Sequence, residues 1–327
     1  MKYFSLKSIA LVLLSASLLT GCNKHDDIDP SIASIAVAND DFQVLEDAAV
    51  RGGVVNVLSN KNLTPGTDGN YTVFAPNNAA FARLGLNNAT DLTTLQTPFL
   101  TNTLLYHVAN GNVLSNALTA GSSTPSALGP QRRIIVRADG SKFVNGSKII
   151  ATDIKAVNGT VHAIDKVLLA TGGNVVESAV ALQSAQVFVN PELTFLVAAV
   201  LRCNLQGTLS APGPYTVFAP TDQAFKNAGI PDIAAINRMD VPTLTAILAN
   251  HVLVNGPTAQ LGDKFTPELP ESTTVTAFSG RPLQLGRFEN GTLTVKSAGI
   301  TEPAKMVIPD VQCTNGVVHV VDRVLLP

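Results

Sequence analysis

Two histidine–aspartate pairs are the residues of this chain best suited to chemistry by type and spacing. His162 and Asp165 form the first pair, and His319 and Asp322 form the second. A histidine beside a carboxylate can relay a proton or help to bind zinc. Both pairs lie in aliphatic segments typical of strands, where side chains three residues apart point to opposite faces. We therefore expect structural roles, in which the histidine bonds a neighbouring backbone group and the aspartate holds a turn or a loop.

A metal site would require further histidines, and His107 and His251 are the candidates. His107 could meet His162 in space, and His251 could meet His319, so that two imidazoles and a carboxylate would suit zinc. No close ligand spacing such as His-Glu-x-x-His supports this alternative, and the sequence has no Gly-x-Ser-x-Gly elbow or phosphate-binding glycine run. We therefore expect no metal, no cofactor, no catalytic residue and no enzyme activity. A hydrolase is the remaining enzymatic alternative, which an esterase and glycosidase screen would expose.

Both pairs belong to an internal duplication. The segment Tyr71–Pro76 returns with identical sequence as Tyr215–Pro220, and residues 158–169 return in similar form as residues 315–326. A repeat of this length exceeds the roughly 20–50 residues of a solenoid unit, so it predicts a whole domain in two copies. The repeated positions that we expect to serve the fold are Thr72, Phe74, Pro76, Phe81, Thr216, Phe218, Pro220 and Phe225.

The same predicted elements open both copies. Apolar residues at helical spacing occur over residues 42–50 and 193–200. The repeated Tyr-Thr-Val-Phe-Ala-Pro segment is β-rich and ends in proline, which predicts a short buried strand. A sharp corner and a helix should follow, with Asn77 or Thr221 as the N-cap.

The elements that close each copy are also alike. In the first copy, Leu100, Leu104 and Val108 share one face of a further predicted helix. Strands with glycine turns come next. Residues 161–169 and 317–326 carry aliphatic side chains on both faces, so each should form a central strand rather than an edge.

The copies differ most in the length of one segment. His107 and Asn158 are 51 residues apart, whereas His251 and Asn315 are 64 apart, so the second copy has about thirteen extra residues within 256–300. Extra loop length costs little stability, and loops commonly carry function. We therefore expect partner-specific surface in this segment.

A basic segment and a short linker complete the organisation of the domains. Arg132, Arg133 and Arg137 surround a predicted strand, which is typical of a solvated edge that resists aggregation. A patch for anionic glycans is the sharper alternative. The linker at residues 170–173 is short enough for the two domains to dock against each other.

Residues 1–21 have the features of a bacterial export signal. Lys2 and Lys7 precede an apolar run that is too short to span a bilayer as a helix. The run ends in Leu-Thr-Gly-Cys, which resembles the lipobox of bacterial lipoproteins and implies cleavage before Cys22 and acylation of that cysteine; an ordinary secretory signal is the alternative. Residues 22–32 then form a polar tether that we expect to be flexible. We therefore expect a lipid-anchored protein of the cell envelope, in the outer membrane. The lysine followed by acidic residues in the tether is similar to surface-export signals, which would place the protein at the cell surface.

Composition argues against a general nucleic-acid binder. Without residues 1–21 the chain has 20 basic and 24 acidic residues, a net charge of −4, whereas phosphate binding needs a basic face. Tryptophan is absent and tyrosine is rare, so stacking platforms for sugars or bases are few. Cys203 and Cys313 both lie in the second copy, where an oxidising compartment permits a disulfide and two buried thiols are the alternative.

These motifs together resemble the fasciclin domain. Thr-Val-Phe-Ala-Pro-x-x-x-Ala-Phe is similar to the first box of that family, and Asn-Gly-x-Val-His-x-x-Asp-x-Val-Leu-Leu is similar to the second, in both copies. The resemblance covers residues 33–170 and 171–327. It implies an α+β fold of two tandem domains, each a β-wedge or sandwich with helices packed around it.

The resemblance also implies a function. Tyr106 and His107 are similar to a Tyr-His dipeptide between the two boxes, whereas the second copy has Asn250 before His251. The family implies extracellular adhesion or binding to a protein, matrix component or glycan without catalysis, which makes Tyr106, His107 and His251 the candidate binding residues. The leading hypothesis is a lipid-anchored adhesion protein whose partners are the membrane and an extracellular component. The alternative is a glycan-binding accessory lipoprotein of a nutrient-uptake system.

Overall fold

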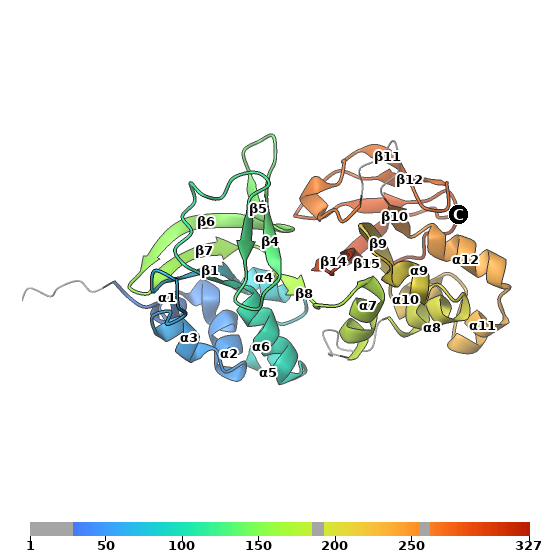
Figure 1. Ribbon diagram of the computed structural model, residues 1–327. Coiled ribbons are helices and arrows are strands. Elements are labelled where there is room, and N and C mark those ends of the chain that lie inside the picture. Colours follow the sequence, from blue (N-terminus) through green and yellow to red (C-terminus); the bar gives the residue numbers. More distant parts are fainter. Residues whose placement is uncertain (1–28, 185–192, 255–261) are drawn as a thin grey trace, which may run out of the picture.

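The computed structural model describes residues 29–184, 193–254 and 262–327 (Figure 1). The predicted leader, the predicted lipidation site Cys22 and the tether up to residue 28 lie outside the described residues. The end of the tether contacts the first domain, since Val157 N–H donates to the Pro30 carbonyl at 3.0 Å. In the described part of the chain, no helix combines the length and the apolar character that a membrane crossing requires.

The first domain contains helices followed by a sheet. Its elements in chain order are α1 (Ile32–Val37), η1 (Asp40–Phe42), α2 (Gln43–Arg51), α3 (Val55–Ser59), β1 (Tyr71–Pro76), α4 (Asn78–Ala82), α5 (Ala89–Leu92), α6 (Thr97–Tyr106), β2 (Val108–Asn110), β3 (Ser123–Pro125), β4 (Gln131–Val136), β5 (Lys142–Val144), β6 (Ser147–Ala156), β7 (Gly159–Ile164) and β8 (Leu169–Ala170).

The second domain repeats this plan. Its elements are α7 (Val175–Ser184), α8 (Thr194–Arg202), α9 (Gln206–Ser210), β9 (Tyr215–Pro220), α10 (Asp222–Asn227), α11 (Ile233–Arg238), α12 (Val241–Ala249), β10 (Val252–Val254), η2 (Thr266–Glu268), β11 (Thr273–Thr276), β12 (Pro282–Leu285), β13 (Thr294–Lys296), β14 (Ala304–Gln312) and β15 (Gly316–Val321).

The two sheets have equivalent strand orders, β2-β1-β7-β6-β5-β4-β3 and β10-β9-β15-β14-β13-β12-β11. In each, the repeated Tyr-Thr-Val-Phe-Ala-Pro strand pairs antiparallel with a short strand and parallel with the closing strand. The helices of both domains gather on the lower side of the sheets in Figure 1. Mixed helices and strands in two equivalent units match the expected α+β class.

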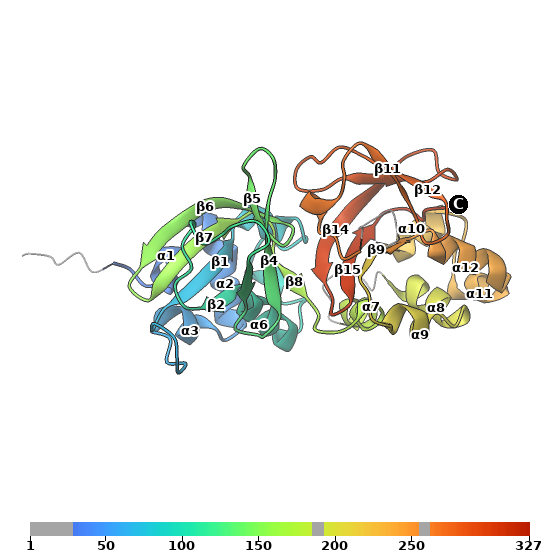
Figure 2. The same cartoon turned by 45° about the horizontal axis from the view of Figure 1, so that its top comes forward.

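The closing strands β7 and β15 are central, and every residue in them is buried, as predicted. They are shorter than predicted, because β7 ends at Ile164 and β15 ends at Val321. The chain turns after Ile164, and β8 leaves the first sheet to pair in parallel with residues Val311 and Gln312 of β14 in the second domain. The predicted single strand over residues 161–169 is therefore two elements, and the second belongs to the junction between domains (Figure 2).

Helix boundaries follow local chemistry. Asn77 and Thr221 act as the predicted N-caps, and their side chains accept hydrogen bonds from Ala80 N–H and Ala224 N–H. The prediction that Val108 extends the helical face of Leu104 is wrong. Helix α6 ends at Tyr106, and Val108 begins β2, where its side chain is buried against the sheet.

Apolar side chains pack on both faces of each sheet. The helix-side core of the first domain includes Phe42, Ala48, Phe81, Leu100 and Val161, and that of the second includes Leu182, Ala199, Phe225, Leu244 and Val318. On the other face, Phe74 and Phe218 enter separate clusters formed with the folded-over strands. Burial on both sides explains the continuous aliphatic composition of β7 and β15.

Candidate functional site

The four described histidines are held by backbone groups. His162 Nδ1 accepts from Asp153 N–H at 3.3 Å, and its Nε2 donates to the Val113 carbonyl at 2.8 Å. His319 repeats this arrangement with Asp310 N–H at 3.1 Å and the Lys264 carbonyl at 2.9 Å. Burial lowers the pKa of both rings, and for His319 it outweighs the nearby Asp310 carboxylate, so both are neutral near pH 7.

The paired aspartates hold backbone turns. Asp165 Oδ1 accepts from Lys148 N–H at 2.7 Å, and Asp322 Oδ1 accepts from Lys305 N–H at 2.7 Å. Each aspartate thus fastens the end of the closing strand to the neighbouring strand. The two His-x-x-Asp pairs stabilise the fold in equivalent ways, and neither forms a proton relay.

His107 and His251 are equally enclosed. Nε2 of His107 accepts from Leu168 N–H at 2.9 Å, and Nε2 of His251 accepts from Leu325 N–H at 2.8 Å. Nδ1 of each ring bonds a carbonyl four residues earlier in its helix. Burial lowers the pKa of each to about 4. Each ring therefore joins a helix end to the segment after the closing strand.

The prediction that Tyr106, His107 and His251 contact an external partner is corrected by their burial, since each side chain is at most 2% exposed. The Tyr106 hydroxyl instead donates to Oε1 of Gln312 in the second domain. Asn145 supports this contact by donating to the same Gln312 oxygen at 2.9 Å. Tyr106 is therefore part of the junction between the domains.

The repeated motif positions are structural in both copies. All eight are buried, namely Thr72, Phe74, Pro76, Phe81, Thr216, Phe218, Pro220 and Phe225. Thr72 illustrates the role, since its hydroxyl donates to the Gly111 carbonyl at 2.8 Å and accepts from Val113 N–H at 2.7 Å. These contacts hold the loop after β2 against the sheet.

No group of three or more His, Cys, Asp or Glu residues in the described ranges has the arrangement needed to hold a metal ion. The possible zinc pairs fail locally, because both nitrogens of His107, His162, His251 and His319 already bond protein groups. Cys203 and Cys313 are free thiols, and Cys313 is buried.

The two domains dock through a buried ion pair. Lys166 Nζ lies 2.6 Å from Oδ2 of Asp310, and the side chains are 7% and 8% exposed. The ammonium also donates to the Gly291 carbonyl at 2.7 Å, and Thr266 N–H donates to Asp310 at 2.6 Å. Burial would raise the pKa of Asp310, but Lys166, His319 and these hydrogen bonds outweigh it and hold the pKa below its ordinary value.

The basic segment also faces the second domain. Arg133 lies 2.9 Å from Glu268, and Arg137 lies 2.6 Å from Glu271. The Arg137 guanidinium also covers the ring of Phe288, 4.3 Å from its centroid. The prediction of a solvated edge is therefore wrong for these arginines, because the extra segment of the second domain covers them.

Arg132 is completely buried, and no carboxylate in the described part of the chain pairs with it. It donates to the carbonyls of Tyr106 at 2.6 Å and Pro125 at 3.1 Å, and it lies over the ring of Phe74 at 4.9 Å. Burial lowers its pKa to about 10. Arg132 thus stabilises the interior of the first domain. The sequence pattern of three arginines did not predict this role.

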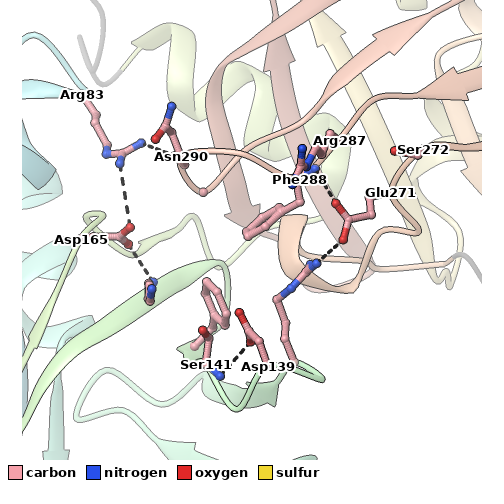
Figure 3. Close-up of a pocket in the computed structure, with 13 residues that line it drawn as sticks. Arg83, Asp139, Ser141, Asp165, Glu271, Ser272, Arg287, Phe288 and Asn290 are labelled. Atoms are coloured by element: carbon pink, nitrogen blue, oxygen red, sulfur yellow. Dashed lines mark hydrogen bonds and ion pairs between the residues drawn. The ribbon is translucent and has the colours of Figure 1, made fainter.

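A polar pocket of about 850 Å³ lies between the domains (Figure 3). Strands and turns of the first domain form one wall, and the extra segment of the second domain forms the other. The lining residues are Arg83, Arg137, Asp139, Ser141, Phe143, Lys148, Asp165, Glu271, Ser272, Arg287, Phe288, Asn290 and Gly291. This pocket is the candidate functional site, because both copies contribute to it and its lining is rich in charge.

Ion pairs and backbone bonds position the pocket walls. Arg83 donates to the Asn290 carbonyl at 2.8 Å and lies 3.9 Å from Asp165, so it joins the two domains (Figure 3). Glu271 accepts from Phe288 N–H at 3.0 Å, and this backbone bond is the main cause that lowers the Glu271 pKa. The walls are therefore fixed independently of any ligand.

Of the pocket residues, sequence reasoning had singled out only Asp165 and Arg137. Lys148 lies on β6, and Arg287 lies in the loop between β12 and β13, so no short motif contains both. The signal that did exist was the extra length within residues 256–300. The described part of that segment supplies the whole second-domain wall of the pocket.

Comparison with known proteins agrees with the duplicated architecture. The fasciclin domain model matches residues 40–170 and 191–327. Transforming growth factor-beta-induced protein ig-h3 of Sus scrofa is 31% identical over 268 residues, which cover 79% of this chain and 35% of that protein. The chain thus spans about a third of the length of that relative.

Single-domain and structural matches were also found. The uncharacterized protein sll1735 of Synechocystis is 36% identical over 132 residues, which cover 40% of this chain and 86% of that protein. A solved FAS1 domain pair of the insect cell adhesion molecule fasciclin I covers 90% of this chain and 96% of its own, with 16% identity and a TM-score of 0.38. The family model matches well over half of the residues, so this chain belongs to the fasciclin domain family, with two copies in tandem.

Proposed function

We propose that this protein is a lipid-anchored, extracytoplasmic adhesion or binding protein that recognises an extracellular protein or matrix component. The observation that carries the proposal is the polar pocket between the docked domains, which presents charged and hydroxyl groups from both copies. No histidine among the described residues lines this pocket, and the four described histidines elsewhere are neutral and saturated by backbone hydrogen bonds, which favours a binding role over catalysis. Membership of the fasciclin family supports the same reading.

A glycan-binding accessory role in nutrient uptake is the second candidate. The size and polarity of the pocket favour it, since small-molecule sites typically occupy about 300–1,000 Å³. Both candidate functions require the protein to lie outside the cytoplasm, so the lipid anchor does not distinguish between them. The chemical class of the ligand that the pocket binds distinguishes them.

The anchor is testable through Cys22. Replacing Cys22 with alanine should abolish incorporation of labelled fatty acid and release the protein from the membrane fraction, since acyl chains supply the membrane affinity. Retention of the variant in the membrane with no loss of label would contradict the lipoprotein proposal. A Cys203→Ala variant serves as the matched control, because that thiol lies in the folded second domain.

Binding is testable with residues 23–327, which keep every described residue. We expect this soluble form to bind matrix-coated surfaces or cells saturably and with salt sensitivity, because the pocket is lined by charges. Absence of saturable binding to every surface tested would count against adhesion. Binding that persists on bare plastic but not on cells or matrix would count against it as well.

A further inference from the structure

We propose that the pocket between the domains binds an acidic oligosaccharide, with uronate carboxylates bound by Lys148 of the first domain and by Arg287 of the second. This ligand class deepens the proposed function and rests on it, because the pocket must face extracellular ligands. No single domain could bind in this way, since each supplies one of the two cations.

The two cations have unused hydrogen-bonding capacity. Both side chains line the pocket, and Lys148 is exposed. Within the described residues, the Lys148 ammonium has no hydrogen-bond or ion-pair partner. Arg287 is 77% exposed and reaches Glu289 only through Nε, at 3.6 Å. Its two terminal nitrogens are therefore available for the paired N–H···O bonds that a carboxylate accepts.

The other charges of the pocket suit sugar hydroxyl groups. The carboxylates of Asp139, Asp165 and Glu271 each accept backbone N–H bonds, which fix their orientation. A carboxylate has about four acceptor positions, so each retains capacity for hydroxyl donors. Ser272 and Asn290 add neutral polar groups to the same lining. A ligand rich in hydroxyls can donate to the remaining acceptor positions, whereas a purely anionic ligand offers them no donor.

Charge balance separates this ligand from other anions. The lining has four basic and three acidic side chains, so its net charge is small. A dense polyanion such as a heavily sulfated chain would meet three carboxylates at close range, where like charges repel. An acidic peptide carries carboxylates but few hydroxyl donors. A hydroxyl-rich chain that carries a few uronates matches the two available cations and the acceptors around them.

Isothermal titration calorimetry of residues 23–327 with trigalacturonate tests the proposal. The methyl-esterified trisaccharide keeps the rings and removes the charge, and triglutamate keeps the charge and removes the rings. We compare wild type with Lys148→Ala/Arg287→Ala. Lys61→Ala/Arg202→Ala is the matched control, since it removes the same two charges at exposed positions that do not line the pocket.

We expect wild type and the control to bind trigalacturonate with equal affinity. The Lys148→Ala/Arg287→Ala variant should bind it about a hundredfold more weakly, or about tenfold for each cation removed, because one charge-assisted hydrogen bond is worth about that factor. The ester and the peptide should bind much more weakly. Equal binding of the ester, tighter binding of triglutamate, equal loss in both double variants, or no binding by wild type would each overturn the proposal. If trigalacturonate does not bind but the protein still binds matrix or cells, only the ligand class fails and the proposed function stands.

Discussion

Replacing Gly146 with alanine should separate the two domains without unfolding either. Gly146 lies in the turn between β5 and β6 of the first domain. A Cβ atom there would lie 1.9 Å from Cγ and from Oδ2 of Asp310 in the second domain, whereas real Cβ contacts are essentially never below 3.0 Å. The Gly146 backbone is not in the left-handed region, so alanine fits the first domain itself.

The magnitude follows from what Asp310 holds. Its carboxylate must retreat by about 1 Å, which breaks its 2.6 Å contacts with Lys166 Nζ and Thr266 N–H. Separating one partner from a buried ion pair costs about 3–5 kcal/mol, because a charge is left without compensation. Each domain keeps its own apolar core. We therefore expect the interface to open and hydrate rather than retain a buried, unpaired charge.

Calorimetry and small-angle X-ray scattering report the two consequences. The variant should show a lower first unfolding transition, separated from the second, and a larger radius of gyration. Gly207→Ala is the matched control, since Gly207 is exposed and a Cβ atom added there would have no neighbouring atom within 4 Å. A variant at Gly146 with the unfolding profile and scattering of wild type would refute the reasoning.

Three further predictions concern buried groups. Because burial lowers the pKa of His107 and His251 to about 4, the unfolded chain binds protons before the folded chain as the pH falls. The stability that these neutral rings contribute is therefore complete above pH 6.5 and falls between pH 6.5 and about 4, by at most roughly 1.4 kcal/mol per pH unit for each ring in urea titrations. Replacing both with glutamine should reduce that slope without removing it, because burial also lowers the pKa of His162 and His319, and an unchanged slope would contradict the prediction. Cys203 should react with a thiol reagent in the native protein, whereas Cys313 should not, because burial raises the Cys313 pKa to about 12. Equal labelling of the two cysteines in a mass spectrum would contradict this prediction. Arg132→Met should lower the free energy of unfolding by roughly 3 kcal/mol, measured in urea titrations, because the buried carbonyls of Tyr106 and Pro125 lose their hydrogen-bond donor. An unchanged free energy of unfolding would show that these carbonyls find other donors.

Local patterns in the sequence predicted most elements of the fold. Residue type and period alone identified the identical strands β1 and β9, the N-caps Asn77 and Thr221 of the helices that follow them, and the buried closing strands. Strand length was less predictable. Asp165 and Lys166 interrupt the apolar residues directly after Ile164, but aliphatic residues on both sides of them favoured one continuous strand.

The roles of charged residues depended on the tertiary structure. Arg132, Arg133 and Arg137 have similar sequence surroundings, yet one is buried inside a domain and two bond the neighbouring domain. Tyr106 resembled a surface binding residue and is instead covered at the junction. A side chain's exposure depends on what the rest of the chain places over it, and local composition does not contain that information.

The sequence by itself determined that one folding unit occurs twice, because the period, the turn residues and the two repeated boxes are short-range properties of the chain. It also marked the extra segment of the second copy as the main difference between the units. Only the tertiary structure decided that this segment docks on the first domain, that Asp310 of β14 pairs with Lys166, and that a polar pocket with cations on both sides lies between the domains. The physical reason is that ion pairing and desolvation act through space between residues more than a hundred positions apart, whereas sequence patterns report only on neighbours.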